Sequence, residues 1–259
     1  MKNAEGRGTA QGRRSDLLRL SRALGRNEHH LAILAEGNTS TRLAGGRILV
    51  KASGSTLGSL RSNDLVECRS AALLALLDVA HPDDPALDRA LRASCVRWNG
   101  KKPSVEALFH AWLLTLPGVE FVGHAHPVAA GQVLCSPRAR EFAARRVFPD
   151  EVVCCGAESV FVPYTDPGHP LAREIRKRTK AFMKRRGAPP RVILLENHGV
   201  ITMGKTPDAV MAAMLMADKA AQVWVGAVRL GGPNFMSSRD IRRIADRSDE
   251  HYRRRVLNL

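Results

Sequence analysis

Aromatic side chains are scarce in this 259-residue chain, which has two tyrosines, seven phenylalanines and three tryptophans. The formal net charge of +15 would suit a nucleic-acid binder, a membrane-surface protein or an enzyme for anionic substrates. Base stacking needs aromatic rings, so their scarcity weakens the nucleic-acid interpretation. The basic residues are scattered, with denser helix-like patches at 173–186, 239–243 and 252–255. Because solvated charge usually explains such patches, we expect only weak, nonspecific affinity for nucleic acid.

Cysteine is also sparse and forms no zinc-binding pattern. The five cysteines lie at positions 68, 95, 135, 154 and 155, and none of them belongs to a C-x-x-C motif. An odd number of cysteines, in a chain whose N-terminus does not look like an export signal, indicates reduced thiols. We therefore expect all five to be structural.

Long apolar runs are absent too. None approaches the ~20 residues that span a bilayer, so we expect no membrane association. The polar stretch at 1–14 lacks the apolar centre of a secretory signal, which predicts a cytoplasmic location. Hydrophobic content of 44% and charged content of 25% are typical of globular proteins. With no repeat or low-complexity block, the sequence predicts a flexible N-terminus at 1–13 and a single domain over 14–259.

Segments with helical spacing alternate with short extended segments, which indicates an α/β domain. Ser15 and Ser104 are candidate N-caps, and Thr206-Pro207 resembles a helix start. We expect helices at residues 15–26, 70–80, 105–116, 127–135, 171–186 and 206–230. The expected extended segments are 34–54 with a glycine turn, 64–69, 119–126, two pieces of 151–165 around Gly156, and 191–204 with a turn at 197–199.

The stretch FVGHAHP, residues 121–127, holds two histidines two positions apart. Side chains of a β-strand repeat their direction every two residues, so His124 and His126 point to one face of the predicted strand. That is a chelating arrangement. Two histidines on the polar face of an ordinary strand would show the same spacing, so the pair alone does not decide between the two interpretations.

A third histidine and a carboxylate could complete a metal site. His198 lies in a turn before a glycine, from which it could reach a cleft or remain on the surface. Glu106 begins the helix capped by Ser104, where the helix dipole favours its ionised form. His110, four residues after Glu106, lies on the same helix face and is a competing ligand. We expect the remaining histidines to be surface residues, namely His29, His30, His81, His169 and His251.

Five motifs together resemble the class II aldolase/adducin family. They are GNTSTR (37–42), KASG (51–54), PSVEALFH (103–110), GHAHP (123–127) and ENHGVITMG (196–204), in that family's order and spacing over roughly residues 15–230. The resemblance implies an α/β fold of three αβα layers, in which helices flank a central, largely antiparallel sheet. It also implies a homotetramer with active sites between subunits.

The resemblance assigns roles to the histidines and to Glu106. It implies that His124, His126 and His198 bind a divalent metal, and three imidazoles with one open position suit Zn²⁺, with Co²⁺ or Mn²⁺ as alternatives. Glu106 then matches the family's acid/base, which can also reach the metal when no substrate is bound. A second proton donor is commonly a tyrosine of a neighbouring subunit. Tyr252 is our choice over Tyr164, although an ordinary surface tyrosine would look alike.

The family's phosphate-binding residues map onto Gly37, Asn38, Ser53, Gly54 and Ser104. Backbone N–H groups at glycine turns and helix N-termini bind phosphate oxygens. Aldolases for sugar 1-phosphates often have two serines before the glutamate, whereas this chain has Ser104-Val105, so one hydroxyl donor is missing. Lys51 could compensate with its charge, or it could simply point to solvent.

The implied function is cleavage of a ketose or sugar phosphate through a metal-stabilised enediolate. Pentulose 5-phosphate 4-epimerases of this family tend to have aspartate at the position of Glu106, which favours the lyase. Decarboxylases of 3-oxo sugar-acid phosphates use the same metal chemistry and remain an alternative. A non-catalytic adducin-like interaction module is a further alternative, against which the three histidines and Glu106 argue.

Overall fold

A mixed sheet forms the centre of the molecule. The computed structural model describes residues 9–80 and 82–247, and within them the seven strands are arranged in the order β3-β2-β1-β4-β7-β6-β5. All neighbouring strands run antiparallel except β5 and β6. The strands are β1 (Asn38–Leu43), β2 (Arg47–Lys51), β3 (Leu65–Arg69), β4 (Phe121–Ala125), β5 (Val160–Val162), β6 (Val192–Leu195) and β7 (Gly199–Gly204). The predicted, largely antiparallel sheet is confirmed.

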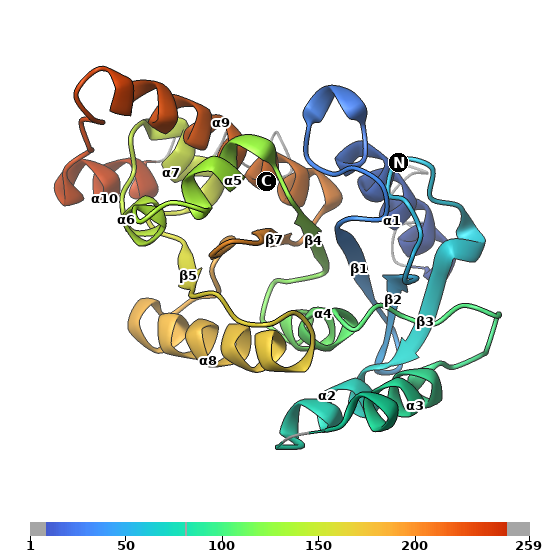
Figure 1. The fold of residues 1–259 in the computed structure, drawn as a ribbon. Coiled ribbons are helices and arrows are strands. Elements are labelled where there is room, and N and C mark those ends of the chain that lie inside the picture. Colours follow the sequence, from blue (N-terminus) through green and yellow to red (C-terminus); the bar gives the residue numbers. More distant parts are fainter. Residues whose placement is uncertain (1–8, 81, 248–259) are drawn as a thin grey trace.

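Helices cover both faces of this sheet (Figure 1). On one side lie α1 (Ala10–Leu24), α5 (Val128–Leu134), α6 (Ala139–Ala144), α7 (Pro149–Cys155), α9 (Pro207–Arg229) and α10 (Ser238–Asp246). On the other lie α2 (Ser70–Asp78), α3 (Asp84–Ser94), α4 (Ala107–Leu113) and α8 (His169–Arg186). None of the described helices is long and apolar enough to cross a membrane.

Alternation along the strands divides the interior into two cores. In β4, Phe121 and Ala125 belong to the core with α1 and α9, whereas Val122 belongs to the core with α4 and α8. Because successive strand side chains point to opposite faces, one buried strand serves both cores. The expected three-layer αβα architecture is therefore confirmed.

Two local predictions were wrong, and one helix was missed. Helix α1 begins at Ala10 with Thr9 as its N-cap, so it starts before Ser15 and includes residues 10–13, which the sequence placed in a flexible segment. Residues 149–155 form helix α7 rather than an extended piece, since Pro149 starts a helix and Gly156 ends it with φ 84°. Helix α3, capped by Asp83, was not predicted.

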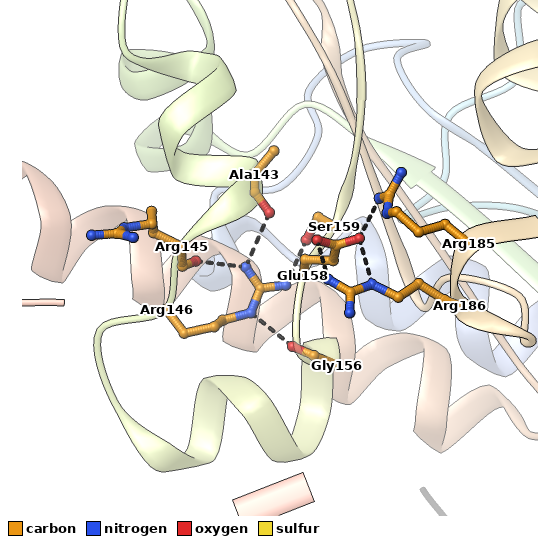
Figure 2. Close-up of polar contacts among 8 residues, drawn as sticks. All are labelled: Ala143, Arg145, Arg146, Gly156, Glu158, Ser159, Arg185 and Arg186. Atoms are coloured by element: carbon orange, nitrogen blue, oxygen red, sulfur yellow. Dashed lines mark hydrogen bonds and ion pairs between the residues drawn. The ribbon is translucent and has the colours of Figure 1, made fainter. Parts of the chain in front are cut away.

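Arg146 joins α6, α7 and the segment before β5 from inside the fold. Its side chain is 1% exposed and lies 3.5 Å from the carboxylate of Glu151. The guanidinium also donates hydrogen bonds to four acceptors, which are the carbonyl oxygens of Ala143, Arg145 and Gly156 and the hydroxyl of Ser159 (Figure 2). Because so many acceptors surround it, this buried cation is compensated entirely by the chain itself.

Glu158 fastens the same segment to the C-terminal end of α8. Its carboxylate accepts hydrogen bonds from Arg186 at 2.9 Å and 2.6 Å and from Arg185 (Figure 2). Part of the basic patch at 173–186 is therefore paired with acidic groups rather than merely solvated.

Candidate metal centre

Three imidazoles converge at one end of the sheet. His124 lies in β4, His126 follows that strand, and His198 lies in the turn between β6 and β7. One nitrogen from each ring falls within 4.8 Å of the others. Among the described residues, no other set of histidines, cysteines and carboxylates is gathered in this way. The structure thus places both members of the predicted His124/His126 pair on one side, together with His198.

Backbone geometry brings the turn at 197–199 against the end of β4. Asn197 adopts a left-handed conformation with φ 52°, and His198 follows it. At Gly199, a Cβ atom would lie 2.5 Å from the carbonyl oxygen of Ala125 and 2.7 Å from Cδ2 of His126. Only glycine permits this approach without a shift, so Gly199 is needed for the imidazoles to meet.

Glu106 completes the group from the other layer. It occupies the N-cap of α4, and its Oε1 lies 3.3 Å from Nε2 of His124 and 4.0 Å from Nε2 of His198. The hydroxyl of Ser104 accepts a hydrogen bond from the backbone N–H of Glu106 at 3.3 Å. Burial alone would raise the pKa of this carboxyl, but the neighbouring His124, through its charge and its hydrogen bond, holds that pKa well below the usual range. Glu106 is therefore ionised at neutral pH.

Two of the three rings are neutral and ready to bind a metal, and the third is hydrogen-bonded so that its Nε2 faces the other two. Nδ1 of His124 lies 3.0 Å from the carbonyl oxygen of Val200, which can only accept, so Nδ1 carries the proton and donates. Burial, followed by the proximity of His124, lowers the pKa of both His126 and His198 to about 4. Burial would lower the pKa of His124 as well, but the carboxylate of Glu106 raises it. His126 and His198 are therefore neutral at pH 7 and offer lone pairs.

The spacing of the donor atoms fits a small divalent cation. Nε2 of His126 lies 3.1 Å from Nε2 of His124. Zinc–imidazole bonds of about 2.0–2.1 Å in tetrahedral geometry put ligand atoms about 3.3 Å apart. Three imidazoles and a nearby carboxylate are also the ligand types that such cations prefer. The residues present therefore fit a divalent metal.

His110 is not part of this group. Its ring is fully buried, stacks on Phe109 with a centroid distance of 4.7 Å, and has Nδ1 2.7 Å from the hydroxyl of Ser40. Burial lowers the pKa of His110 to about 3, so the ring is neutral. Nε2 of His110 has no hydrogen-bond partner.

Two candidate phosphate-binding residues lie directly beside the imidazoles. Gly37 has φ 68°, and a Cβ atom there would lie 2.6 Å from the carbonyl oxygen of His124. Asn38 pairs with His124 across β1 and β4, so the two side chains share one face of the sheet. The Asn38 side chain is fully buried, and its Nδ2 has no partner. This amide is a donor without an acceptor next to the metal centre.

The other three candidates lie in neighbouring loops. Ser53 and Gly54 are exposed and follow β2, and the N–H of Ser53 donates to the carbonyl oxygen of Lys102 at 3.0 Å. A β-bridge between Ala52 and Pro103 holds these two loops side by side. Ser104 therefore lies near Ser53, and all five predicted residues gather at the end of the sheet that holds the histidines.

Lys51 is buried rather than pointing to solvent. Its side chain donates hydrogen bonds to the carbonyl oxygens of Ala35 at 3.2 Å and Ser55 at 2.7 Å, and the residue is 2% exposed. Burial lowers the pKa of its ammonium group, while Glu106 opposes this effect. Strand periodicity could have predicted the burial, because Lys51 lies two residues after the buried Leu49.

The carboxylate of Glu36 was also missed from the sequence. Its Oε1 lies 3.8 Å from Nδ1 of His126, on the side of the ring away from the other histidines. No spacing rule links the two residues, because one precedes β1 and the other follows β4. Only the pairing of those strands brings them together.

The remaining predicted residues have mixed outcomes. Tyr252 lies outside the described residues, as do His81 and His251. Tyr164 is 56% exposed, and its hydroxyl donates to Asp166 at 3.2 Å, which raises the pKa of the phenol. The surface prediction for His169 was wrong, since it is 5% exposed, with Nε2 3.0 Å from the carbonyl oxygen of Leu76.

Comparison with known proteins decides the family. The profile of the class II aldolase and adducin N-terminal domain matches residues 15–225. The chain belongs to the class II aldolase/adducin family. Its fold matches the N-terminal class II aldolase domain of a conserved protein from Thermoplasma acidophilum, with a TM-score of 0.66 and 26% identity over 81% of this chain and 92% of that one. An L-fuculose 1-phosphate aldolase superposes with a TM-score of 0.68 at 16% identity, covering 92% of this chain and 96% of that one, which shows a shared fold.

Two curated relatives of this family member differ in their stated activities. A 3-oxo-tetronate 4-phosphate decarboxylase of Haemophilus influenzae is 29% identical over 188 residues, or 70% of this chain and 73% of that protein. YuxG of Bacillus subtilis, an uncharacterized oxidoreductase, is 24% identical over 159 residues, or 61% of this chain and 21% of that protein. The chain thus spans about a fifth of the length of YuxG.

Proposed function

We propose that this protein is a metal-dependent aldolase that cleaves a carbon–carbon bond in a ketose, with sugar phosphates as the substrate class. The observation that carries the proposal is the three-imidazole group with the Glu106 carboxylate 3.3 Å from Nε2 of His124. A purely structural group of histidines has no need to direct its nitrogens at one another. We propose Zn²⁺ as the metal, with Co²⁺ and Mn²⁺ as alternatives.

Carbon–carbon cleavage requires that negative charge on the substrate oxygens be stabilised and that a proton be transferred to or from the substrate carbon. Cleaving a bond next to a carbonyl leaves negative charge on substrate oxygens, and a divalent cation would stabilise that charge as a Lewis acid. The ionised Glu106 is the only carboxylate at the inner side of the imidazoles among the described residues. It can take a proton from the substrate carbon in the condensation direction and return it after cleavage.

The surrounding residues would position an anionic substrate. Asn38 offers an unpartnered amide donor on the face that carries His124. The loops of Ser53, Gly54 and Ser104 offer hydroxyl and backbone N–H groups nearby, which can bind phosphate oxygens without a full countercharge. Lys51 is held by two carbonyl oxygens, so it adds positive potential from below rather than direct contact.

Decarboxylation of a 3-oxo sugar-acid phosphate is the second candidate, favoured by the similarity to the Haemophilus influenzae decarboxylase. That reaction also leaves negative charge on a substrate oxygen, so the same imidazoles and cation would serve it. The two reactions differ in their products. An aldolase releases an aldehyde, whereas a decarboxylase releases carbon dioxide.

We propose a homotetramer with active sites between subunits, in which Tyr252 of a neighbouring subunit takes the hydroxyl proton as the aldehyde leaves and gives it back to the aldehyde oxygen in the condensation direction. We also propose that the protein acts in the cytoplasm.

The deciding experiment measures metal first and products second. We expect about one divalent metal per chain by elemental analysis, strongly reduced in His126→Ala and unchanged in His29→Ala, a control outside the group. The wild type is then supplied with ketose phosphates and 3-oxo acid phosphates, and aldehyde and carbon dioxide are assayed separately. Full metal content in His126→Ala would refute the site, and carbon dioxide without aldehyde would replace the aldolase by the decarboxylase.

A further inference from the structure

The segment of residues 31–37, here called the strap, runs beside the end of β4. The backbone N–H of His126 donates to the carbonyl oxygen of Leu31 at 2.8 Å. The ammonium group of Lys51 donates to the carbonyl oxygen of Ala35, which ties the strap to β2. At the far end of the strap, Gly37 packs against the carbonyl oxygen of His124. The strap therefore contacts the backbone of both His124 and His126.

Glu36 is held in place within the strap. One carboxylate oxygen accepts a hydrogen bond from the N–H of Ile33 at 3.0 Å, and the N–H of Glu36 donates to the carbonyl oxygen of Ile33 at 3.0 Å. These two bonds close a turn in which Leu34 adopts φ 50°. The other oxygen faces Nδ1 of His126 at 3.8 Å. The carboxylate thus has one oxygen committed to the turn and one directed at the ring.

The two nitrogens of His126 face different groups. Nε2 lies 3.1 Å from Nε2 of His124, in the centre of the imidazole group, and Nδ1 faces Glu36. A ring that binds a cation through Nε2 must carry its proton on Nδ1. A carboxylate next to Nδ1 favours that tautomer, because it can accept the N–H.

His124 shows the same arrangement with a different acceptor. Its Nδ1 donates to the carbonyl oxygen of Val200, which leaves Nε2 directed at the centre. The backbone fixes that ring. Among the described residues, no backbone oxygen accepts a hydrogen bond from Nδ1 of His126, and the side-chain carboxylate of Glu36 lies at the corresponding place.

We propose that Glu36 is the positioning residue for His126: it accepts a hydrogen bond from Nδ1–H, holds the ring's metal-binding tautomer and makes Nε2 a stronger donor. This inference rests on the proposed metal centre. A ring that gives its Nε2 lone pair to a cation would be a better N–H donor, so the carboxylate of Glu36 would stabilise the metal-bound ring more than the free one. Outer partners of this kind typically contribute about 10- to 100-fold to metal affinity.

The test compares Glu36→Gln and Glu36→Ala with the wild type and with a matched control. Glu28→Gln removes a carboxylate that is also 3.8 Å from its partner, Arg26, but lies away from the imidazoles. Zn²⁺ affinity is measured by competition with a chelator, and the His126 tautomer is read from long-range ¹H–¹⁵N spectra of the metal-free protein. Circular dichroism checks that each variant is folded. If Glu36→Ala does not fold, the comparison of Glu36→Gln with the wild type tests the role of Glu36.

We expect the Zn²⁺ dissociation constant to rise about 10- to 100-fold in Glu36→Ala and less in Glu36→Gln, whose amide oxygen still accepts. The share of His126 with its proton on Nδ1 should fall in both variants, and Glu28→Gln should match the wild type. Wild-type affinity and tautomer in both variants, together with metal loss in His126→Ala, would overturn the role of Glu36 and leave the metal centre intact. A wild type that binds no metal would overturn both.

Discussion

The imidazole group and the Arg146 cluster are both buried polar sites, yet the chain completes only one of them. Arg146 and Glu151 are 1% and 4% exposed as side chains, and the guanidinium finds acceptors in three carbonyl oxygens and a hydroxyl. At the other site the nitrogens of His124 and His126 face each other at 3.1 Å, and the nearby Asn38 and His110 have polar atoms without partners. Unsatisfied buried groups are costly, so they mark a place that a ligand completes.

We infer from this difference that the Arg146 cluster contributes to stability and the imidazole group to function. Removing a group from the Arg146 cluster should weaken the fold and leave chemistry intact, because its hydrogen bonds and its ion pair involve no residue of the imidazole group. Removing a group from the imidazole site should weaken chemistry and leave the fold largely intact. Burying polar groups without partners at that site destabilises the folded state, so the fold does not depend on them.

Glu106→Gln should have the largest effect. It keeps the side chain's size but removes proton transfer, so we expect cleavage and solvent exchange of the α-proton of dihydroxyacetone phosphate to fall by about 10² to 10⁴. Metal content should change much less, because the three histidines remain. Deuterium incorporation followed by NMR measures the exchange, with a metal-stripped sample and Glu141→Gln, a surface carboxylate, as controls. Unimpaired exchange would remove Glu106 from the mechanism, and loss of metal would mean that it is mainly a ligand.

Arg146→Met should lower the free energy of unfolding by about 3–5 kcal/mol, because it leaves Glu151 buried without its cation. Chemical denaturation measures the change, with the exposed Arg243→Met as control, for which we expect less than about 0.5 kcal/mol. Metal bound per folded molecule should be unchanged. Adding Glu151→Leu should restore part of the loss, since the orphaned charge is then removed as well. If Arg146→Met kept its stability but lost its metal, the Arg146 cluster would serve metal binding rather than stability, which would contradict the proposed difference between the two sites.

Gly199→Ala should affect both properties, since this position joins the fold to the imidazoles. The added methyl group meets the carbonyl oxygen of Ala125 and the ring of His126, and overpacking of this kind costs about 1–3 kcal/mol. We also expect weaker Zn²⁺ binding, because the ring must move. Gly226→Ala in α9 is the matched control, since a Cβ atom there meets nothing within 4 Å. That change should be neutral or stabilising by up to about 1 kcal/mol. Equal behaviour of the two variants would contradict the role given to Gly199.

The contrast between the two sites also explains what the sequence could predict. Strand periodicity placed His124 and His126 on one face, and the glycine after His198 marked the turn that carries it. These signals are local, and the order of the motifs supplied the family. Glu36 and the Arg146 cluster depend on contacts between segments far apart in the chain, which no local spacing encodes. Residues 151–155 were misassigned because a short apolar run fits a buried strand as well as a helix.

Glu158→Gln should have the smallest effect, and its size depends on pH. The hydrogen bonds from Arg186 and Arg185 lower the pKa of this carboxyl to about 2. A carboxyl whose pKa is lower in the folded state stabilises the fold above its unfolded pKa, about 4.3, and loses that contribution as the pH falls toward 2. Because the contact is partly exposed, solvent screening should limit the contribution to about 1 kcal/mol.

Denaturation of wild type and Glu158→Gln at pH 7 and pH 3 measures this contribution. We expect the wild type to be the more stable protein at pH 7 and the difference to shrink at pH 3, whereas metal content at pH 7 should be the same in both. High salt should also reduce the difference at pH 7, since it screens exposed charges. A difference that persists unchanged at pH 3 would show that Glu158 acts through packing rather than charge, which would bring this surface contact closer to the buried Arg146 cluster that it adjoins.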